Sequence, residues 1–189
     1  MKKAIIFHGT DCKPEDFWYE WLKTGLEKAG YQVELPYYKD MNRVPIAEFL
    51  PGVMERFPLT EETLLIGHSA GVPLILAMLE KSDQRIHKAV LVAGFSEPLS
   101  GDRDVILQDS YDWKKIKQSA KSFIFFNSDN DPWGCDHKQG KRMHDNLGGK
   151  LFIKHDGHFG STSMNQPYRE FPELLKECLY EPKSATKTF

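Results

Sequence analysis

A serine between small residues is the first group in this sequence whose setting points to chemistry. Ser69 is the centre of the pentapeptide Gly-His-Ser-Ala-Gly at 67–71, which follows the apolar run 63–66 and precedes the apolar-rich run 72–81. A strand that enters Gly-x-Ser-x-Gly and leaves as a helix is the signature of a nucleophile elbow, a tight turn that lifts the serine hydroxyl above the sheet edge. The two glycines let strand and helix pass closely around a strained serine. The pattern therefore predicts a nucleophilic Ser69, with an ordinary small-residue turn as the alternative.

A serine hydroxyl is a poor nucleophile at neutral pH and needs a base within hydrogen-bond reach. In an open α/β sheet, that base comes from a loop at the carboxyl ends of the strands, the edge at which the serine stands. Of the seven histidines, His155 and His158 follow the last expected strand, and Gly157 places His158 in the loop proper. We predict His158 as the base and keep His155 as the alternative.

The group that orients the base is expected in the loop after the strand 122–126, which contains Asp129 and Asp131. Asp131 precedes a proline and is therefore held extended, so that its side chain can reach towards the histidine loop. Asp129 is more typical of a turn residue that bonds to its own backbone. We predict Asp131 as the acid, with Asp129 as the alternative. The resulting order Ser, Asp, His along the chain is that of α/β hydrolases.

Two backbone amides are expected to stabilise an oxyanion beside this serine. The amide of Ala70 falls in the first turn of a helix, where donors are unpaired and the helix dipole favours negative charge. Gly9 permits a tight turn after the first strand, so that the amide of Thr10, or alternatively of Asp11, can face the same point. We predict Ala70 and Thr10 as the oxyanion donors.

The loops at this edge also contain side chains that could form a substrate pocket. We expect two histidines beside turn glycines to shape or cover the site, and aromatic side chains in or beside the loops to receive an apolar acyl group. The predicted pocket residues are His8, Phe17, His68, Trp133 and Phe159. Such chemistry needs neither a metal nor an organic cofactor.

Composition limits the classes of partner. The chain has 189 residues, 40% of them hydrophobic, and a formal net charge of −2, which gives no electrostatic reason to expect nucleic acid or an anionic membrane as a partner. The apolar run at 4–7 is too short for a signal peptide or a membrane span. The three cysteines form no Cys-x-x-Cys pair, so free thiols in a reducing, cytoplasmic setting are expected.

Continuous apolar strands alternate with helical patterns along the chain, which predicts a parallel sheet of about six strands covered on both faces, a three-layer α/β/α sandwich. We expect a single domain over 1–181 and a flexible tail over 182–189. The expected strands are 3–7, 31–35, 63–66, 89–93, 122–126 and 151–153. A helix over 46–57 is expected to be interrupted or restarted at Pro51-Gly52, and the segment 95–112 is either a lid or binding loop or a solvated excursion.

The order and spacing of the serine pentapeptide, of Ser-Asp-Asn-Asp-Pro at 128–132 and of Gly-His-Phe at 157–159 resemble the small serine-hydrolase family typified by YdeN and retinoblastoma-binding protein 9. The resemblance spans nearly the whole chain. It implies a reduced α/β-hydrolase fold with strand order 2-1-3-4-5-6 and no cap domain. It also implies a nucleophile at Ser69, an acid at Asp131 and a base at His158. The turn His-Gly-Thr-Asp at 8–11 departs from the more glycine-rich turn of that family, which leaves the second oxyanion donor open.

These features predict a serine hydrolase that cleaves a small-molecule ester through an acyl-serine intermediate. Two alternative functions are also compatible with the sequence. One is amide or peptide hydrolysis by the same groups, and the other is a non-catalytic protein-binding module on the same fold. The acyl group of the substrate does not follow from the sequence, because specificity depends on the shape of the pocket.

Overall fold

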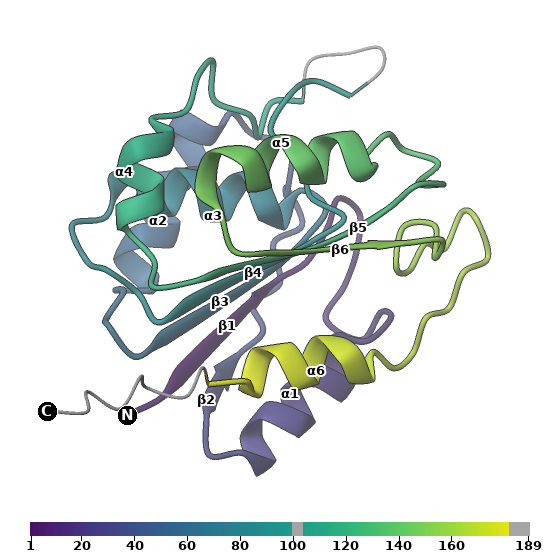
Figure 1. Ribbon diagram of the computed structural model, residues 1–189, viewed down its shortest axis with the longest axis horizontal. Helices are drawn as coiled ribbons and strands as arrows, with labels where there is room; N and C mark the ends of the chain where they lie inside the picture. Colours follow the sequence, from purple (N-terminus) through teal and green to yellow (C-terminus); the bar gives the residue numbers. More distant parts are fainter. Residues whose placement is uncertain (100–103, 182–189) are drawn as a thin grey trace, which may run out of the picture.

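The computed structural model describes residues 1–99 and 104–181, and its strands form one six-stranded sheet (Figure 1). Every neighbouring pair is parallel, and the order is β2-β1-β3-β4-β5-β6. This confirms the parallel sheet and the order that the family resemblance implied. The strands are β1 (Lys3–Phe7), β2 (Gln32–Glu34), β3 (Thr63–His68), β4 (Lys88–Val92), β5 (Phe123–Ser128) and β6 (Lys150–Lys154).

Helices cover both faces of the sheet, as a parallel sheet with crossover connections requires. Figure 1 shows α1 (Tyr19–Lys28) and α6 (Pro172–Leu179) together on one face. The opposite face is covered by α2 (Ile46–Arg56), α3 (Gly71–Lys81), α4 (Trp113–Gln118) and α5 (His137–Leu147). The predicted three-layer sandwich is therefore confirmed. Among the described helices, none combines the length and apolar character needed to cross a bilayer.

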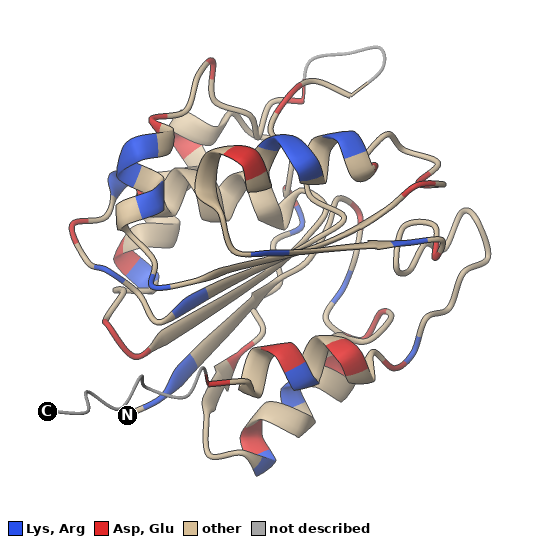
Figure 2. Cartoon of the chain, in the orientation of Figure 1, with Lys and Arg blue, Asp and Glu red and all other residues tan. Residues whose placement is uncertain are grey.

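The core is fully buried along β3 and along most of the helix that follows it. All six residues of β3 are buried, and so are the nine consecutive residues from Gly71 to Leu79 in α3. A helix that is apolar on all sides must be enclosed, and α3 lies against β3 and is flanked by α2 and α4. Acidic and basic residues lie instead along the outer helices and the sheet ends (Figure 2). The turn between β3 and α3 is thus held between two fully buried segments.

The strand order reverses at β1, because the chain moves from β1 to β2 on one side and returns to β3 on the other. Ligands of open α/β sheets bind at such a switch point, outside the carboxyl ends of the strands. The loops after β1 and β3 both leave from this point. The fold therefore places residues 8–12 beside the serine turn.

The structure corrects the expected break at Pro51. Helix α2 runs without interruption from Ile46 to Arg56 and contains Pro51 in its interior. Proline removes one hydrogen bond to the carbonyl four residues earlier, here that of Ala47. Because Ala47, Pro51 and Gly52 all lie on the exposed side of the helix, water can satisfy that carbonyl. Burial of Ile46 and Val53 on the other side holds the helix together.

The described part of the segment 95–112 packs against the molecule. Ile106 is fully buried, and its amide donates to the side chain of Asn42 at 3.1 Å, while the amide of Ile46 donates to the carbonyl of Val105 at 3.0 Å. The described residues of this segment before α4 contain no helix or strand that could form a cap domain. Its described residues are not a solvated excursion, whereas residues 100–103 and the expected tail at 182–189 lie outside the described residues.

A buried lysine closes the C-terminal end of α6. The side chain of Lys88, at the start of β4, is only 2% exposed, and its ammonium donates to the carbonyls of Glu177, Cys178 and Tyr180 at 2.9, 3.0 and 2.7 Å. The last carbonyls of a helix have no partner within the helix and favour a positive charge. Burial lowers the pKa of Lys88. This lysine therefore joins the central sheet to the last helix.

Replacing Lys88 with methionine keeps the aliphatic stem but leaves three carbonyls without their donor. We expect Lys88→Met to lower the free energy of unfolding by about 2 to 3 kcal/mol, because unsatisfied buried acceptors lose their solvation without compensation. Urea denaturation followed by circular dichroism measures the change. Lys141→Met is the control, because Lys141 pairs with Asp145 on an exposed helix face and such pairs contribute about 0.5 kcal/mol. Equal effects of the two changes would contradict the capping role.

Candidate active site

The turn from β3 into α3 holds Ser69 in a strained backbone conformation. Its φ is +52°, in the left-handed region that residues other than glycine rarely adopt. A Cβ atom on Gly67 would come within 2.8 Å of the carbonyl oxygen of Gly71, and one on Gly71 would collide with the carbonyl oxygen of Phe7. Both positions thus require glycine, as the sequence indicated. The amide of Ser69 donates to the carbonyl of Val92 at 2.9 Å, which anchors the strained residue to β4.

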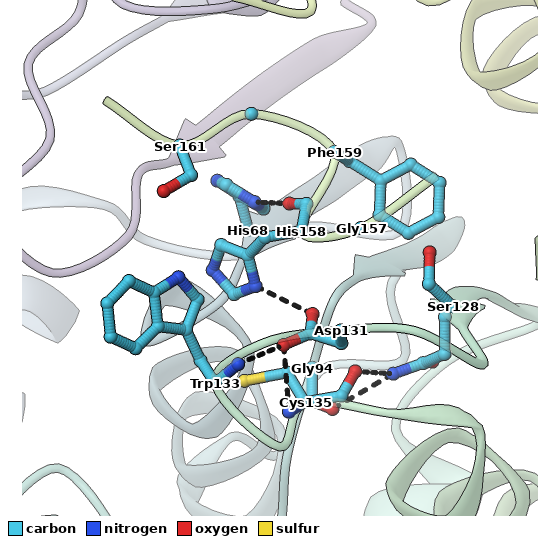
Figure 3. A network of polar contacts seen from close by, with 12 residues as sticks. His68, Gly94, Ser128, Asp131, Trp133, Cys135, Gly157, His158, Phe159 and Ser161 are labelled. Carbon is cyan, nitrogen blue, oxygen red and sulfur yellow. Dashed lines mark hydrogen bonds and ion pairs between the residues drawn. The ribbon is translucent and has the colours of Figure 1, made fainter. Parts of the chain in front are cut away.

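His158 and Asp131 form a buried pair at the same sheet edge. Nδ1 of His158 lies 2.7 Å from Oδ2 of Asp131, and the side chains are 9% and 0% exposed (Figure 3). The other carboxylate oxygen of Asp131 accepts hydrogen bonds from the amides of Trp133 at 2.8 Å and Cys135 at 3.3 Å. These donors fix the carboxylate and leave one oxygen for the imidazole. Ser69 and His158 line the same cavity.

The two alternatives that the sequence left open pair with each other. Nδ1 of His155 lies 2.6 Å from Oδ1 of Asp129, and their side chains are 78% and 50% exposed. This second pair lies on the surface, outside the cavity that Ser69 lines. The geometry therefore groups His158 and Asp131 with the serine and separates His155 and Asp129 from it.

A buried thiol lies beneath the serine. Ligand atoms of Asp131, Cys135 and His158 lie within 4.8 Å of one another, the one such group among the described residues. Burial raises the pKa of the Cys135 thiol well above its ordinary value, with the Asp131 carboxylate adding to the rise and the hydroxyl of Ser69 beside it opposing it. A metal needs a thiolate, and the carboxylate and imidazole already bond to each other. The group is therefore better suited to holding hydrogen bonds than a cation.

The residues predicted to donate to an oxyanion lie on the serine turn and on the wall of the cavity. Ala70 is the N-cap residue of α3 and is fully buried, directly after Ser69. Thr10 and Asp11 both line the cavity, on the loop that follows β1. The carboxylate of Asp11 is turned outwards, where it pairs with Arg43 at 2.6 Å. A Cβ on Gly9 would come within 3.0 Å of the Cβ of Ser69, so glycine allows this loop to approach the serine closely.

A cavity of about 500 Å³ opens above the serine. Of the predicted pocket residues, Phe17 and Trp133 line it. Its remaining wall mixes apolar side chains with hydroxyls. The other lining residues include Asn42, Phe95, Leu99, Asp104, Thr162 and Ser163. The volume lies within the range of small-molecule sites.

The prediction that His8, His68 and Phe159 line the pocket was wrong. His8, His68 and Phe159 are all fully buried behind the cavity wall. Phe159 stacks on Phe171, with ring centroids 5.3 Å apart. The amide of Tyr38 donates to Nε2 of His8 at 2.9 Å, so the opposite nitrogen of this ring donates to the carbonyl of Gly9 at 2.7 Å. A position beside a turn glycine therefore did not indicate whether the side chain faces the cavity or the core.

Two residues that connect the site loops to one another, Asn127 and Gln166, were not predicted from the sequence. The side chain of Asn127, near the end of β5, donates to the carbonyl of Gly94 at 3.1 Å and to that of Cys135 at 2.9 Å. These bonds tie the loop that contains Asp131, here called the acid loop, to the segment that follows β4. Gln166 accepts from the amides of His158 at 3.1 Å and Gly160 at 3.2 Å. A polar residue at the end of an apolar strand was the available signal for Asn127. Gln166 gave none, because its partners meet it only through the fold of the loop.

Two of the buried histidines stay neutral. Burial lowers the pKa of His8, and it lowers that of His68 well below 6.5, with the neighbouring His158 adding to the effect. Nε2 of His68 donates to the carbonyl of His158 at 2.8 Å, and Nδ1 lies 2.5 Å from the hydroxyl of Tyr19. A neutral ring can make both of these contacts, whereas a charged ring would have to donate from both nitrogens.

The all-parallel sheet with a strained serine at the β3–α3 turn, and histidine and aspartate on neighbouring loops, defines an α/β hydrolase. The chain belongs to the serine hydrolase family, whose sequence profile matches residues 4–177. It is 29% identical over 176 residues to the hydrolase YdeN of Bacillus subtilis strain 168, covering 86% of this chain and 90% of YdeN. The family resemblance is therefore confirmed.

Solved structures agree with this assignment. The crystal structure of the ydeN gene product from B. subtilis matches with a TM-score of 0.83 and 25% identity, covering 94% of this chain and 96% of that one. The esterase domain of a Rhodothermus marinus protein shares the fold at a TM-score of 0.61 and 12% identity, over 88% and 82% of the two chains. Est1E from Butyrivibrio proteoclasticus shares the fold at a TM-score of 0.66 and 14% identity, covering 94% of this chain and 87% of that one.

The neutral state of His68 makes stability depend on pH. The unfolded chain binds a proton to this histidine below pH 6.5 and the folded chain does not, so stability rises with pH in that window and falls as the solution is acidified. We expect His68→Gln to reduce the loss of unfolding free energy between pH 7.5 and pH 5.5 by about 1 kcal/mol. Urea titrations at the two pH values measure this. His155→Gln, at an exposed ring, is the control, and an equal slope in both variants would contradict the assignment.

Proposed function

We propose that this serine hydrolase is a carboxylic ester hydrolase in which Ser69 is the nucleophile, His158 the general base and Asp131 the group that orients the base. The observation that carries the proposal is the 2.7 Å contact between His158 and Asp131, buried at the edge of the cavity that Ser69 lines. A buried carboxylate bonded to Nδ1 fixes the tautomer that presents Nε2 to a serine and stabilises the imidazolium that forms.

In the proposed reaction, Oγ of Ser69 forms a bond to the ester carbonyl carbon while its proton moves to Nε2 of His158. The carbonyl oxygen becomes an oxyanion that the amides of Ala70 and Thr10 stabilise. The bond to the alcohol oxygen then breaks, and His158 returns the proton to that leaving group. Water, deprotonated by His158, releases the acyl group from Ser69 as a carboxylic acid. The sum is an ester and water giving an acid and an alcohol.

The hydroxyl of Ser69 rests beside the thiol of Cys135 in the structure. Its rotation towards His158 is part of the proposal, since catalytic hydrogen bonds of substrate-free enzymes often tighten only when substrate binds. Ser69 lines the cavity, and its backbone is held in the turn with φ of +52°.

The cavity supports a small or medium acyl substrate. Its volume of about 500 Å³ suits a small molecule, and the aromatic rings of Phe17, Phe95 and Trp133 offer an apolar surface to it. Two structures that share the fold support this proposal. One is named as the esterase domain of a Rhodothermus marinus protein, and the other is Est1E with ferulic acid bound. The three cysteines are free thiols, which supports a reducing, cytoplasmic setting.

Labelling with a fluorophosphonate tests the nucleophile. We expect intact-mass analysis to find one phosphonyl adduct on the folded protein, mapped to Ser69 and absent from Ser69→Ala. Turnover of p-nitrophenyl esters should fall by on the order of 10⁴-fold or more in the same variant, because the groups of such a site act as a unit. An adduct without ester turnover, together with hydrolysis of an anilide of the same acyl group, would favour the amidase alternative. If the folded protein shows no adduct and no turnover, the non-catalytic binding module is favoured.

The aspartate assignment has a matched pair of variants within one loop. We expect Asp131→Asn to lower kcat for ester hydrolysis by on the order of 10³- to 10⁴-fold, because the amide stabilises the wrong imidazole tautomer and no positive charge. Asp129→Asn should leave kcat within about twofold, since Asp129 pairs with His155 on the surface. Steady-state kinetics of the two purified variants decide the question, and a larger loss in Asp129→Asn would reverse the assignment.

A further inference from the structure

Three hydrogen bonds run in series beneath the candidate active site. The amide of Gly9 donates to the hydroxyl of Tyr19 at 3.4 Å, that hydroxyl lies 2.5 Å from Nδ1 of His68, and Nε2 of His68 lies 2.8 Å from the carbonyl oxygen of His158. Tyr19 and His68 are fully buried. Figure 3 shows the last of these contacts, between His68 and His158. The series links the loop after β1, the start of α1, the end of β3 and the loop after β6.

Chemistry fixes the direction of every bond in this series. A carbonyl oxygen only accepts, so His68 must carry its proton on Nε2 to donate to His158. The other nitrogen of a neutral ring then only accepts, so the hydroxyl of Tyr19 must donate to it. The tyrosine oxygen in turn accepts from the amide of Gly9. A single tautomer and a single hydroxyl orientation satisfy all three bonds.

Both ends of the series belong to the proposed chemistry. At one end, Gly9 precedes Thr10, the proposed oxyanion donor, and approaches Ser69 closely. At the other end, the carbonyl belongs to His158, whose ring bonds to Asp131. The middle residue, His68, immediately precedes the nucleophile. One series of buried hydrogen bonds thus connects three parts of the site. These are the oxyanion loop (residues 8–12), the strand β3 that leads to the nucleophile, and the base loop (residues 155–166).

The backbone of His158 is held from both sides. Its carbonyl accepts from His68 at 2.8 Å, and its amide donates to Gln166 at 3.1 Å. The next residue, Phe159, is held as well, since its carbonyl accepts from the indole of Trp18 at 2.9 Å. Because the backbone of His158 is fixed, the single hydrogen bond to Asp131 is enough to hold its ring in place. Loss of the His68 bond would free the backbone on the side that faces the nucleophile.

We propose that Tyr19 and His68 are positioning residues that hold the base loop and the oxyanion loop in register around Ser69. The kinetic consequences of this inference rest on the proposed ester hydrolysis. The relative placement of the two loops is a property of the fold and does not depend on that reaction. The rings of His68 and His158 lie 4.9 Å apart. A neutral His68 therefore lets the base take up a proton without a second positive charge beside it.

The kinetic test compares Tyr19→Phe, His68→Leu and His68→Gln. We expect Tyr19→Phe and His68→Leu to lower kcat for a p-nitrophenyl ester by about tenfold to a hundredfold with KM within about threefold, because misplaced groups lose transition-state contacts more than substrate contacts. His68→Gln can still donate to the His158 carbonyl and should recover most of the activity. Tyr31→Phe removes a hydroxyl from another buried tyrosine, away from the cavity, and is the matched control.

Hydrogen–deuterium exchange provides a readout that needs no substrate. We expect peptides covering 155–166 to exchange faster in Tyr19→Phe and His68→Leu, while peptides from β3 and α3 keep their protection and the melting curve stays cooperative. Tyr31→Phe and His68→Gln should match the wild type. Unchanged loop exchange with unchanged kcat would overturn the inference, as would a uniform loss of protection across the sheet. The wild type could lack Ser69-dependent turnover while the base loop still exchanges faster in the two variants. That combination would support the positioning role of Tyr19 and His68 and refute the proposed ester hydrolysis.

Discussion

The close approach of β1, β3 and α3 around Ser69 is the constraint on which the rest of the site depends. The serine keeps a φ of +52° only because β3 and the wholly buried start of α3 hold its two sides. That approach leaves no room for a side chain at Gly67 or Gly71. Strain of this kind is stored at functional positions and is maintained by the packing around it. Here that packing comes from β3 and the buried start of α3, which lie on either side of the turn.

Hydrogen bonds between loops then turn a sheet edge into a site. The acid loop is tied to the segment after β4 by Asn127, and the base loop is tied to itself by Gln166 and to the nucleophile strand by His68. Loops are otherwise the mobile part of an α/β fold. In a buried setting each such bond is strong, so these bonds favour one arrangement of the loops over others. The site is therefore specified by polar contacts laid over an apolar scaffold.

Much of this fold was readable because its physical causes are local. Apolar runs of strand length placed all six strands within about two residues of their observed bounds. The interruption expected in α2 was wrong because the exposure of Pro51 is a tertiary property. The capping of α6 by Lys88 could not be read either, since a lysine at the start of an apolar strand gives no sign that it meets a helix end 89 positions later.

The sequence by itself determined the nucleophile elbow and its two glycines, because a strained serine limits its neighbours to small residues whatever surrounds it. It also ranked His158 over His155 and Asp131 over Asp129, through a glycine and a proline that act on the adjacent backbone. Only the tertiary structure decided which side chains face the cavity and which lie behind it, as with His8, His68 and Phe159. Whether a ring faces core or cavity depends on contacts between loops that are distant in the chain, and the pattern of neighbouring residues carries no record of them.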